Sequence, residues 1–301
     1  MKFTISEKSE KALTYTLFVL PPLFLFILVI GYPILKSLYL SFTDYNIVKN
    51  EAVWGAGFKW YVKMFKHRDF WWALRNTFIV AGVSVFGQIP IGFVLAYALH
   101  RKFVRFRGFF QGMVFLPVTI SMIVVGLLWL KMFSPVGAIT SLLRIIKDDP
   151  RYTIGIFLNK TWAMLPIGFV LLWQWTGFYM VIFLANLQKL DPSIIEAAMI
   201  DGASEAQIFL KVILPLLAGT IVISSIIAMA GSFKGFALIW ALTRGGPVNF
   251  TEVITIYMYR YAFQYQKYDF GCAISIVIVA ICILLVMLTQ FIKRKLVGEE
   301  L

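Results

Sequence analysis

Polar side chains inside long apolar stretches are the first candidates for chemistry in this sequence, because polar groups at the depth of a bilayer are costly and usually functional. Lys234, in AGSFKGFALIW, follows a long uncharged run and precedes a second apolar stretch. Its ammonium group could bind a hydroxyl or an acidic group of a solute. The solute would then be anionic, such as a uronic-acid oligosaccharide or a sugar phosphate. Alternatively, the long stem of Lys234 could carry the ammonium group to the membrane surface.

A second group of candidates is aromatic and lies in WQWTGFYM, residues 173–180. Aromatic faces can stack on the apolar faces of sugar rings, and the amide of Gln174 could hydrogen-bond to hydroxyl groups. The alternative is that these rings pack inside a helix bundle or form an aromatic belt at the membrane surface. The candidates for a solute path are Lys234, Trp173, Gln174, Trp175, Tyr179, Ser232 and Gln88.

Residue types that carry out catalysis or bind metals are sparse and scattered. His67 and His100 fall in different loops, and Cys272 and Cys282 share one apolar run, which favours small buried hydrophobic residues over a disulfide or a metal site. A membrane-embedded enzyme would need a nucleophile with its base, or metal ligands, near one membrane face. The sequence also lacks the phosphate-binding pattern G-x-x-x-x-G-K-[ST]. We therefore expect no enzyme activity, metal or cofactor in this chain.

The composition of the chain is typical of a membrane protein. Of its 301 residues, 60% are hydrophobic and 14% are charged, whereas a soluble domain is about 45–50% apolar and about 25% charged. Six uncharged runs reach the roughly 20 residues that a membrane-spanning helix needs. The sequence therefore predicts an all-α integral membrane protein with six transmembrane helices, forming a single domain over residues 1–301. The expected spans cover about residues 12–35, 76–99, 108–130, 161–188, 212–242 and 270–292.

The net charge of +13 is expected to face anionic lipid headgroups. Nucleic-acid binding would need a basic soluble face, and no soluble segment is long enough to carry one. The densest basic cluster, HRKFVRFRG at residues 100–108, favours a cytoplasmic position for that loop. Both termini and loop 189–211 are then cytoplasmic. The outer loop 36–75 is rich in aromatic residues, which suits a segment lying on the membrane.

The loop over residues 189–211 contains the signals of two short helices joined by a turn. Asp191 can cap the first helix and Pro192 suits its first position. Gly202 tolerates the left-handed conformation at which many helices end. Ser204 then opens a capping box, SEAQ, that starts the second helix. The loop could be an ordinary connector, but its small residues beside an apolar face would also let a partner approach closely.

These residues resemble the EAA loop of ABC-importer permease subunits, although Val212 stands where that family usually has Ile. Three further stretches, PILKSLYLSFTDYN, LRNTFIVAG and LTRGGPVNFTE, are similar to the carbohydrate-uptake branch of maltose-type and glycerol-phosphate-type permeases. In that family the loop forms coupling helices that dock on a cytoplasmic ATPase. The resemblance therefore implies an ATPase-coupling role for Glu196, Ala197, Ala198, Asp201, Gly202, Ala203 and Phe209, with Leu214-Pro215 completing the pattern.

The resemblance also implies the type of transporter and its other subunits. It implies an ATP-driven importer of a sugar or oligosaccharide in a bacterial inner membrane, with the solute site partly on the fourth span. Its partners would be a second homologous permease subunit, two copies of an ABC ATPase that bind ATP and Mg²⁺, and an extracytoplasmic solute-binding protein. The main alternative is an ion-coupled secondary transporter. That class would need acidic residues or interrupted helices at mid-membrane, and none of the six runs contains Asp or Glu.

Overall fold

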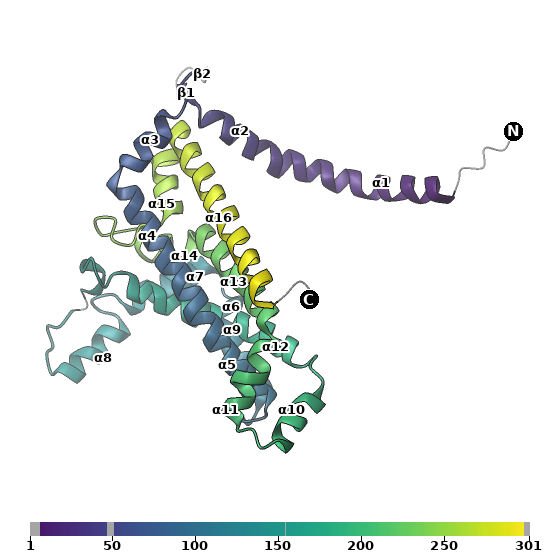
Figure 1. Ribbon diagram of the computed structural model, residues 1–301. Coiled ribbons are helices and arrows are strands. Elements are labelled where there is room, and N and C mark those ends of the chain that lie inside the picture. The colour runs from purple at the N-terminus through teal and green to yellow at the C-terminus, as the bar shows by residue number, and fades with distance from the viewer. Residues whose placement is uncertain (1–6, 47–50, 154, 298–301) are drawn as a thin grey trace. The chain divides into compact units, whose positions relative to one another are not determined.

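The computed structural model describes residues 7–46, 51–153 and 155–297, and its regular structure is helical apart from one two-stranded sheet (Figure 1). The chain forms two compact units. The first combines Met1–Lys66 with Met258–Val277, and the second combines His67–Tyr257 with Ile278–Leu301.

The first unit begins with one long helical segment. It consists of α1 (Glu7–Phe26), η1 (Ile27–Gly31) and α2 (Tyr32–Leu40). Over residues 14–40 no side chain is buried inside the described part of the chain. Exposed apolar side chains along a whole helix require lipid or another subunit as a neighbour.

The rest of the first unit is held together by aromatic residues. Its elements are β1 (Thr43–Asn46), antiparallel β2 (Glu51–Trp54), α3 (Lys59–Lys66), the end of α15 (Ile254–Tyr259), η5 (Arg260–Gln264) and the start of α16 (Tyr268–Val297). The indole nitrogen of Trp60 donates to the carbonyl of Thr43 at 2.9 Å, and its ring lies 6.0 Å from that of Phe270. Trp60 of the predicted outer loop is thus buried in a folded unit, while the position of the loop on a membrane stays a prediction.

The second unit contains most of the helices. Its long elements are α4 (Arg68–Val83), η2 (Ser84–Gln88), α5 (Ile89–His100), α6 (Arg107–Thr119), α7 (Met122–Met132), α9 (Met164–Leu187), α13 (Ala218–Lys234) and α14 (Ala237–Thr243). Its shorter elements are α8 (Ala138–Lys147), η3 (Ile156–Leu158), α10 (Pro192–Ile200), α11 (Glu205–Gln207), η4 (Ile208–Ile213) and α12 (Leu214–Leu216).

Helix α9 is the central element of this unit, and two glycines let its neighbours approach closely. A Cβ on Gly92 of α5 would lie 2.9 Å from the backbone nitrogen of Met180 in α9. A Cβ on Gly177 of α9 would lie 2.2 Å from the backbone oxygen of Val114 in α6. Phe183 of α9 is fully buried in the resulting core. Burial of such a side chain contributes about 1.5–3 kcal/mol.

The prediction of an all-α membrane fold is confirmed. The described residues contain 4 helices long and apolar enough to cross a membrane, or up to 6 if two bent helix pairs each count as one span. The bends measure 97° between α6 and α7 and 70° between α12 and α13. Pro215 lies two residues before the second bend, and its missing backbone N–H disturbs the helix on its N-terminal side, where η4 lies.

Within the predicted fifth span, 212–242, the structure shows an interrupted helix. Helix α13 ends at Lys234, and Gly235 is extended, with φ −62° and ψ 106°. The hydroxyl of Thr255 donates to the carbonyl of Gly235 at 2.7 Å, which stabilises the interruption before α14 begins. The uncharged run ends at Phe233, directly before Lys234 and Gly235, but the prediction continued the helix because the residues after Gly235 are again apolar.

Candidate functional site

Loop 189–211 folds as the two capped helices that its sequence predicts, and it lies at the same end of the second unit as the C-terminal end of α5 (Figure 1). The carboxylate of Asp191 accepts a hydrogen bond from the backbone nitrogen of Ser193 at 3.0 Å, which lowers the pKa of Asp191. At the second helix, the backbone nitrogen of Ser204 donates to Oε1 of Gln207 at 2.8 Å. In return, the backbone nitrogen of Gln207 donates to the Ser204 hydroxyl at 3.4 Å, which completes the capping box.

The turn between the two helices depends on Gly202. This residue has φ +79°, a conformation that costs other residues about 1–2 kcal/mol. Its backbone nitrogen donates to Met199 at 3.1 Å, and that of Ala203 donates to Ala198 at 3.0 Å. These two bonds form the Schellman motif that ends many helices. The turn is therefore preorganised rather than a loose linker.

The surface of the turn is small and open. Glu196, Ala197, Asp201 and Gly202 are exposed, whereas the other predicted coupling residues, Ala198, Ala203 and Phe209, are half-buried. A Cβ on Gly202 would meet no atom of the described chain within 4 Å. Beside these residues, Ile200 is 85% exposed although its side chain is fully apolar.

A cluster of three side chains fixes this loop to α5. The hydroxyl of Tyr97 donates to Oε2 of Glu205 at 2.6 Å, and Nε of Arg101 donates to Oε1 of Glu205 at 3.1 Å. A second guanidinium nitrogen of Arg101 also contacts Oε1, and the hydrogen bond with Glu205 raises the pKa of Arg101. The sequence alone does not reveal this cluster. Tyr97 and Arg101 are one helical turn apart, but nothing in the sequence pairs them with a residue more than a hundred positions away.

Phe209 strengthens the same attachment through its ring. Its centroid lies 4.9 Å from that of Phe93 and 4.9 Å from that of Tyr97. Ile195 and Ile208 are buried in the same core. A displacement of α10 and α11 must therefore move α5 or break these contacts.

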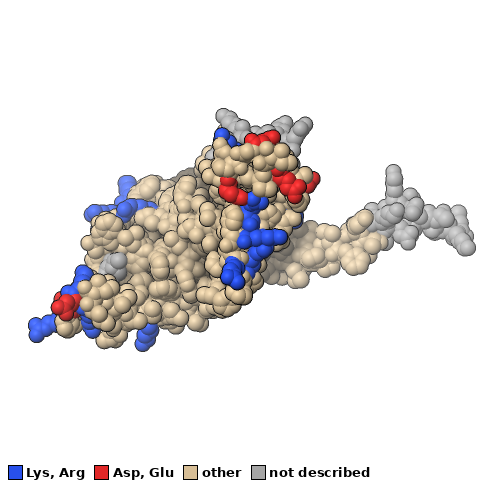
Figure 2. All heavy atoms as spheres, turned by 90° about the horizontal axis from the view of Figure 1, so that it is seen from below, with Lys and Arg blue, Asp and Glu red and all other residues tan. Residues whose placement is uncertain are grey.

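The exposed charges around this end of the unit are of both signs. Figure 2 views the molecule from below and shows acidic side chains gathered on one lobe, with a stripe of basic side chains next to it. A partner that docks here would meet both charge types beside the apolar Ile200 side chain.

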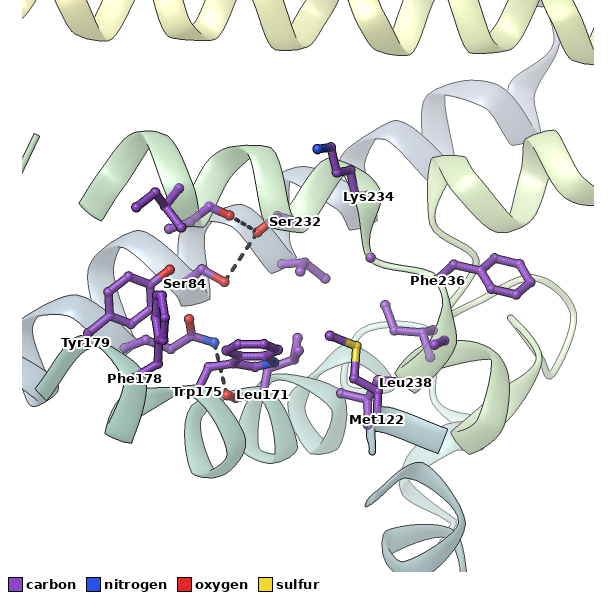
Figure 3. A pocket seen from close by; sticks show the side chains of 18 residues that line it. Ser84, Met122, Leu171, Trp175, Phe178, Tyr179, Ser232, Lys234, Phe236 and Leu238 are labelled. Atoms are coloured by element: carbon purple, nitrogen blue, oxygen red, sulfur yellow. Dashed lines mark hydrogen bonds between the residues drawn. The ribbon is translucent and has the colours of Figure 1, made fainter. Parts of the chain in front are cut away.

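The second candidate site is a cavity of about 430 Å³ inside the second unit (Figure 3). Its walls come from α4, η2, α9, α13, α14 and the start of α7. Five of the predicted solute-path residues line it: Gln88, Trp175, Tyr179, Ser232 and Lys234. The lining also includes Phe178 of the run 173–180, and residues that were not predicted, among them Ser84, Met122 and Phe236.

Most polar groups of the cavity lie on η2 and α13, and Trp175 and Tyr179 of α9 add an indole nitrogen and a hydroxyl. The hydroxyl of Ser232 donates to the carbonyl of Ala228 at 2.8 Å and lies 3.3 Å from the Ser84 hydroxyl. Nε2 of Gln88 donates to the carbonyl of Leu171 at 3.0 Å, which fixes the amide and leaves its oxygen as an acceptor. Ser84 could have been found from the sequence, because it lies one helical turn before Gln88.

Lys234 lies at the edge of the cavity. Its side chain is exposed, and Figure 3 shows it on the opposite side of the cavity from Trp175, with its ammonium end pointing away from the cavity. This geometry places the ammonium group of Lys234 at the mouth of the cavity and does not favour its direct contact with a solute inside.

Two of the predicted solute-path residues lie elsewhere. The ring of Trp173 packs edge-on against that of Trp129, with centroids 5.5 Å apart. Gln174 is fully buried, and its Nε2 donates to the carbonyl of Ile120 at 3.4 Å, at the break between α6 and α7. Successive residues of a helix point in directions about 100° apart, so the cavity takes only Trp175 from the run 173–175.

Comparison with known proteins identifies the class. The model of the family described as "Binding-protein-dependent transport system inner membrane component" matches residues 88–297. The chain therefore belongs to this family of transport components. Membership in this family favours an ABC importer over an ion-coupled secondary transporter. It also agrees with the expectation that the chain is not an enzyme.

Individual relatives cover most of the chain. It is 33% identical over 247 residues to the lactose transport system permease protein LacF of Rhizobium radiobacter, a match that covers 80% of each chain. It is 31% identical over 235 residues to the multiple sugar-binding transport system permease protein MsmF of Streptococcus mutans, covering 78% of this chain and 79% of the relative. A chain of a bacterial alginate ABC transporter, solved with an alginate pentasaccharide-bound periplasmic protein, shares the fold with a TM-score of 0.83, 23% identity and 97% coverage of both chains.

Proposed function

We propose that this chain is the permease subunit of an ATP-driven ABC importer for a sugar or an oligosaccharide. The relatives above transport lactose and multiple sugars according to their names, and further relatives are named for starch degradation products and sn-glycerol-3-phosphate. The cavity supplies chemistry that suits such solutes: aromatic surface from Trp175 and Phe178, with hydrogen-bonding groups from Gln88 and Ser232.

The observation that carries the proposal is the continuity between the two candidate sites. One segment runs from Glu205 through η4 and α12 to Lys234 at the end of α13. The loop that is attached to α5 is therefore continuous in sequence with α13, which supplies a wall of the cavity. A displacement applied at α11 would reach Ser232 along this segment, through the 70° bend between α12 and α13. This arrangement can couple closure of an ATPase at the loop to opening of the cavity.

The partners follow from this role. A second homologous permease subunit would complete the translocation path, and two copies of a cytoplasmic ABC ATPase would bind ATP and Mg²⁺ and dock at the 189–211 loop. An extracytoplasmic solute-binding protein would deliver the solute. The uncovered apolar stretch over residues 14–40 supports contact with lipid or with a second subunit. The basic loop at residues 100–108 supports cytoplasmic termini in an inner membrane.

Co-purification from native membranes in mild detergent tests the proposal. Mass spectrometry is expected to identify a P-loop ATPase and a second permease with its own EAA loop. The neighbouring binding protein would then be screened against neutral and acidic sugars. Isolation of the chain alone, or only with copies of itself, would contradict the proposal and favour the ion-coupled alternative.

The charge of the solute is tested separately at Lys234. If the ammonium group meets an acidic group at the mouth of the cavity, Lys234→Gln should lower uptake of an acidic oligosaccharide and leave that of a neutral one unchanged. Unchanged selectivity would remove Lys234 from the solute path.

A further inference from the structure

The segment over residues 101–109, called the 101–109 loop below, joins α5 to α6 and includes the first three residues of α6; it combines basic and aromatic side chains with no acidic residue of its own. It contains Arg101, Lys102, Arg105 and Arg107, and the sequence has no Asp or Glu between Asp69 and Asp148. Charge neutralisation must therefore come from another part of the chain or from another molecule.

Within the chain, one of the four basic groups is neutralised. Arg101 pairs with Glu205. Lys102, Arg105 and Arg107 are exposed, and in the part of the chain that the structure describes none of the three has an ion-pair partner. Three cations thus remain available on a short segment.

The aromatic side chains of the loop also face outward. Phe103 is 59% exposed, Phe106 is 80% exposed and Phe109 is 72% exposed. Val104, which lies between Phe103 and Phe106 in the sequence, is half-buried and packs against the core of the second unit. This contact anchors the loop. Phe106 has φ +51°, which is uncommon for a bulky residue. The backbone at Phe106 therefore holds its ring on the surface of the chain, where lipid or solvent can contact it.

We propose that the 101–109 loop binds the headgroups of anionic phospholipids. The ends of two predicted membrane helices, α5 and α6, bring the loop to the level of the headgroups. Lys102, Arg105 and Arg107 pair with the lipid phosphates, while the three phenylalanine rings enter the boundary between headgroups and acyl chains. A free phosphate ion, or an acidic protein surface without apolar groups, would satisfy the cations but would leave the three exposed rings uncovered.

Lipid binding is measured by native mass spectrometry on the complex purified with its partners, after exposure to phosphatidylglycerol or phosphatidylcholine. The wild-type chain is expected to retain phosphatidylglycerol preferentially. The triple variant Lys102→Gln, Arg105→Gln, Arg107→Gln should lose affinity on the order of 100-fold, since each basic group near an anionic surface contributes about five-fold. The double variant Phe106→Ser, Phe109→Ser should bind phosphatidylglycerol more weakly. Added salt should still weaken that binding further, because the three basic groups remain.

A matched triple variant controls for total charge. Lys66→Gln, Lys131→Gln and Arg151→Gln removes three exposed basic groups outside the loop and should retain phosphatidylglycerol nearly as well as the wild type. Equal losses in the two triple variants would overturn the proposal, because the attraction would then be a property of the whole basic chain. Competition by inorganic phosphate at equal concentration would also overturn it. Neither measurement depends on which solute is transported.

Discussion

The carboxylate of Glu205 binds two side chains of α5, and this contact makes single residues responsible for the position of the 189–211 loop. The side chain of Arg101 is 19% exposed and that of Glu205 is 45% exposed, so the pair is only partly screened by water. Tyr97 adds a buried hydroxyl as a third member. An interaction with several partners of this kind can position a loop more firmly than an exposed ion pair can.

We expect Glu205→Gln to raise the ATP hydrolysed per solute transported by about three-fold to ten-fold, because a loosened loop transmits ATPase closure less completely. Uptake and hydrolysis are measured on the same proteoliposomes, with Asp148→Asn as a control at an exposed carboxylate. The double variant with Arg101→Gln should be no worse than the worse single variant, as members of one network are non-additive. Additive losses would show that the two residues act independently.

Gly202 allows a test that separates backbone strain from docking. Alanine and aspartate both place a Cβ on a residue at φ +79°, but only aspartate adds a charge to the open space beside the turn. We expect Gly202→Ala to weaken co-purification of the ATPase modestly and Gly202→Asp to weaken it at least ten-fold. Normal transport by Gly202→Asp would remove the turn from the coupling surface.

The neighbouring tryptophans of α9 provide a matched pair for the cavity. Trp175 lines the cavity, whereas Trp173 packs on Trp129 outside it. We expect Trp175→Ala to raise the KM of solute uptake about ten-fold, which corresponds to about 1.4 kcal/mol of binding energy. Trp173→Ala should change KM by less than about two-fold, although it can lower the amount of folded protein. Equal KM effects in the two variants would argue against solute binding in this cavity.

At the scale of elements, the close packing of α9 against α6 depends on the absence of a side chain at Gly177. Gly177→Ala would place a Cβ 2.2 Å from the Val114 carbonyl, and neither backbone can yield easily. We expect the variant to lose about 1–3 kcal/mol of stability, seen as a lower unfolding temperature in detergent. Gly112→Ala on α6 is the control, because no described atom lies within 4 Å of its added Cβ.

The sequence predicted the elements that depend on local chemistry. The caps at Asp191 and Ser204 and the turn at Gly202 were found because each is specified by residues within a few positions. The break at Gly235 was not predicted, because the apolar residues after it continue the run, and the hydrogen bond from Thr255 that stabilises it comes from 20 residues away. The bend between α6 and α7 was missed as well, because both helices are apolar and hydropathy does not register a change of direction.

For the candidate sites, the sequence predicted which residues take part but not the directions in which their side chains point. Polar and aromatic residues in apolar runs identified five cavity residues, but the directions of Trp173 and Gln174 depend on how α9 is rotated against its neighbours. The contact of Glu205 with α5 was invisible because it joins residues 104 positions apart. Long-range packing, rather than local propensity, decides these features.

At the scale of the whole molecule, the proposed function depends on surfaces that the described part of the chain does not cover by itself. The apolar stretch over residues 14–40 and the exposed turn around Ile200 both require neighbours. The first suits lipid or a second permease, and the second suits an ATPase below the membrane. The chain is therefore expected to function as one part of an assembly.

The most direct test of this account is photo-crosslinking from position 200, with a photoreactive amino acid in place of Ile200 in native membranes. The account predicts one main crosslinked product, identified by mass spectrometry as a P-loop ATPase, with a yield that changes when ATP is added. A photoreactive residue at position 145, where Ile145 is also exposed, should give no such product. Crosslinking of position 200 to lipid alone, or to no protein, would contradict the central claim that this loop couples the chain to an ATPase.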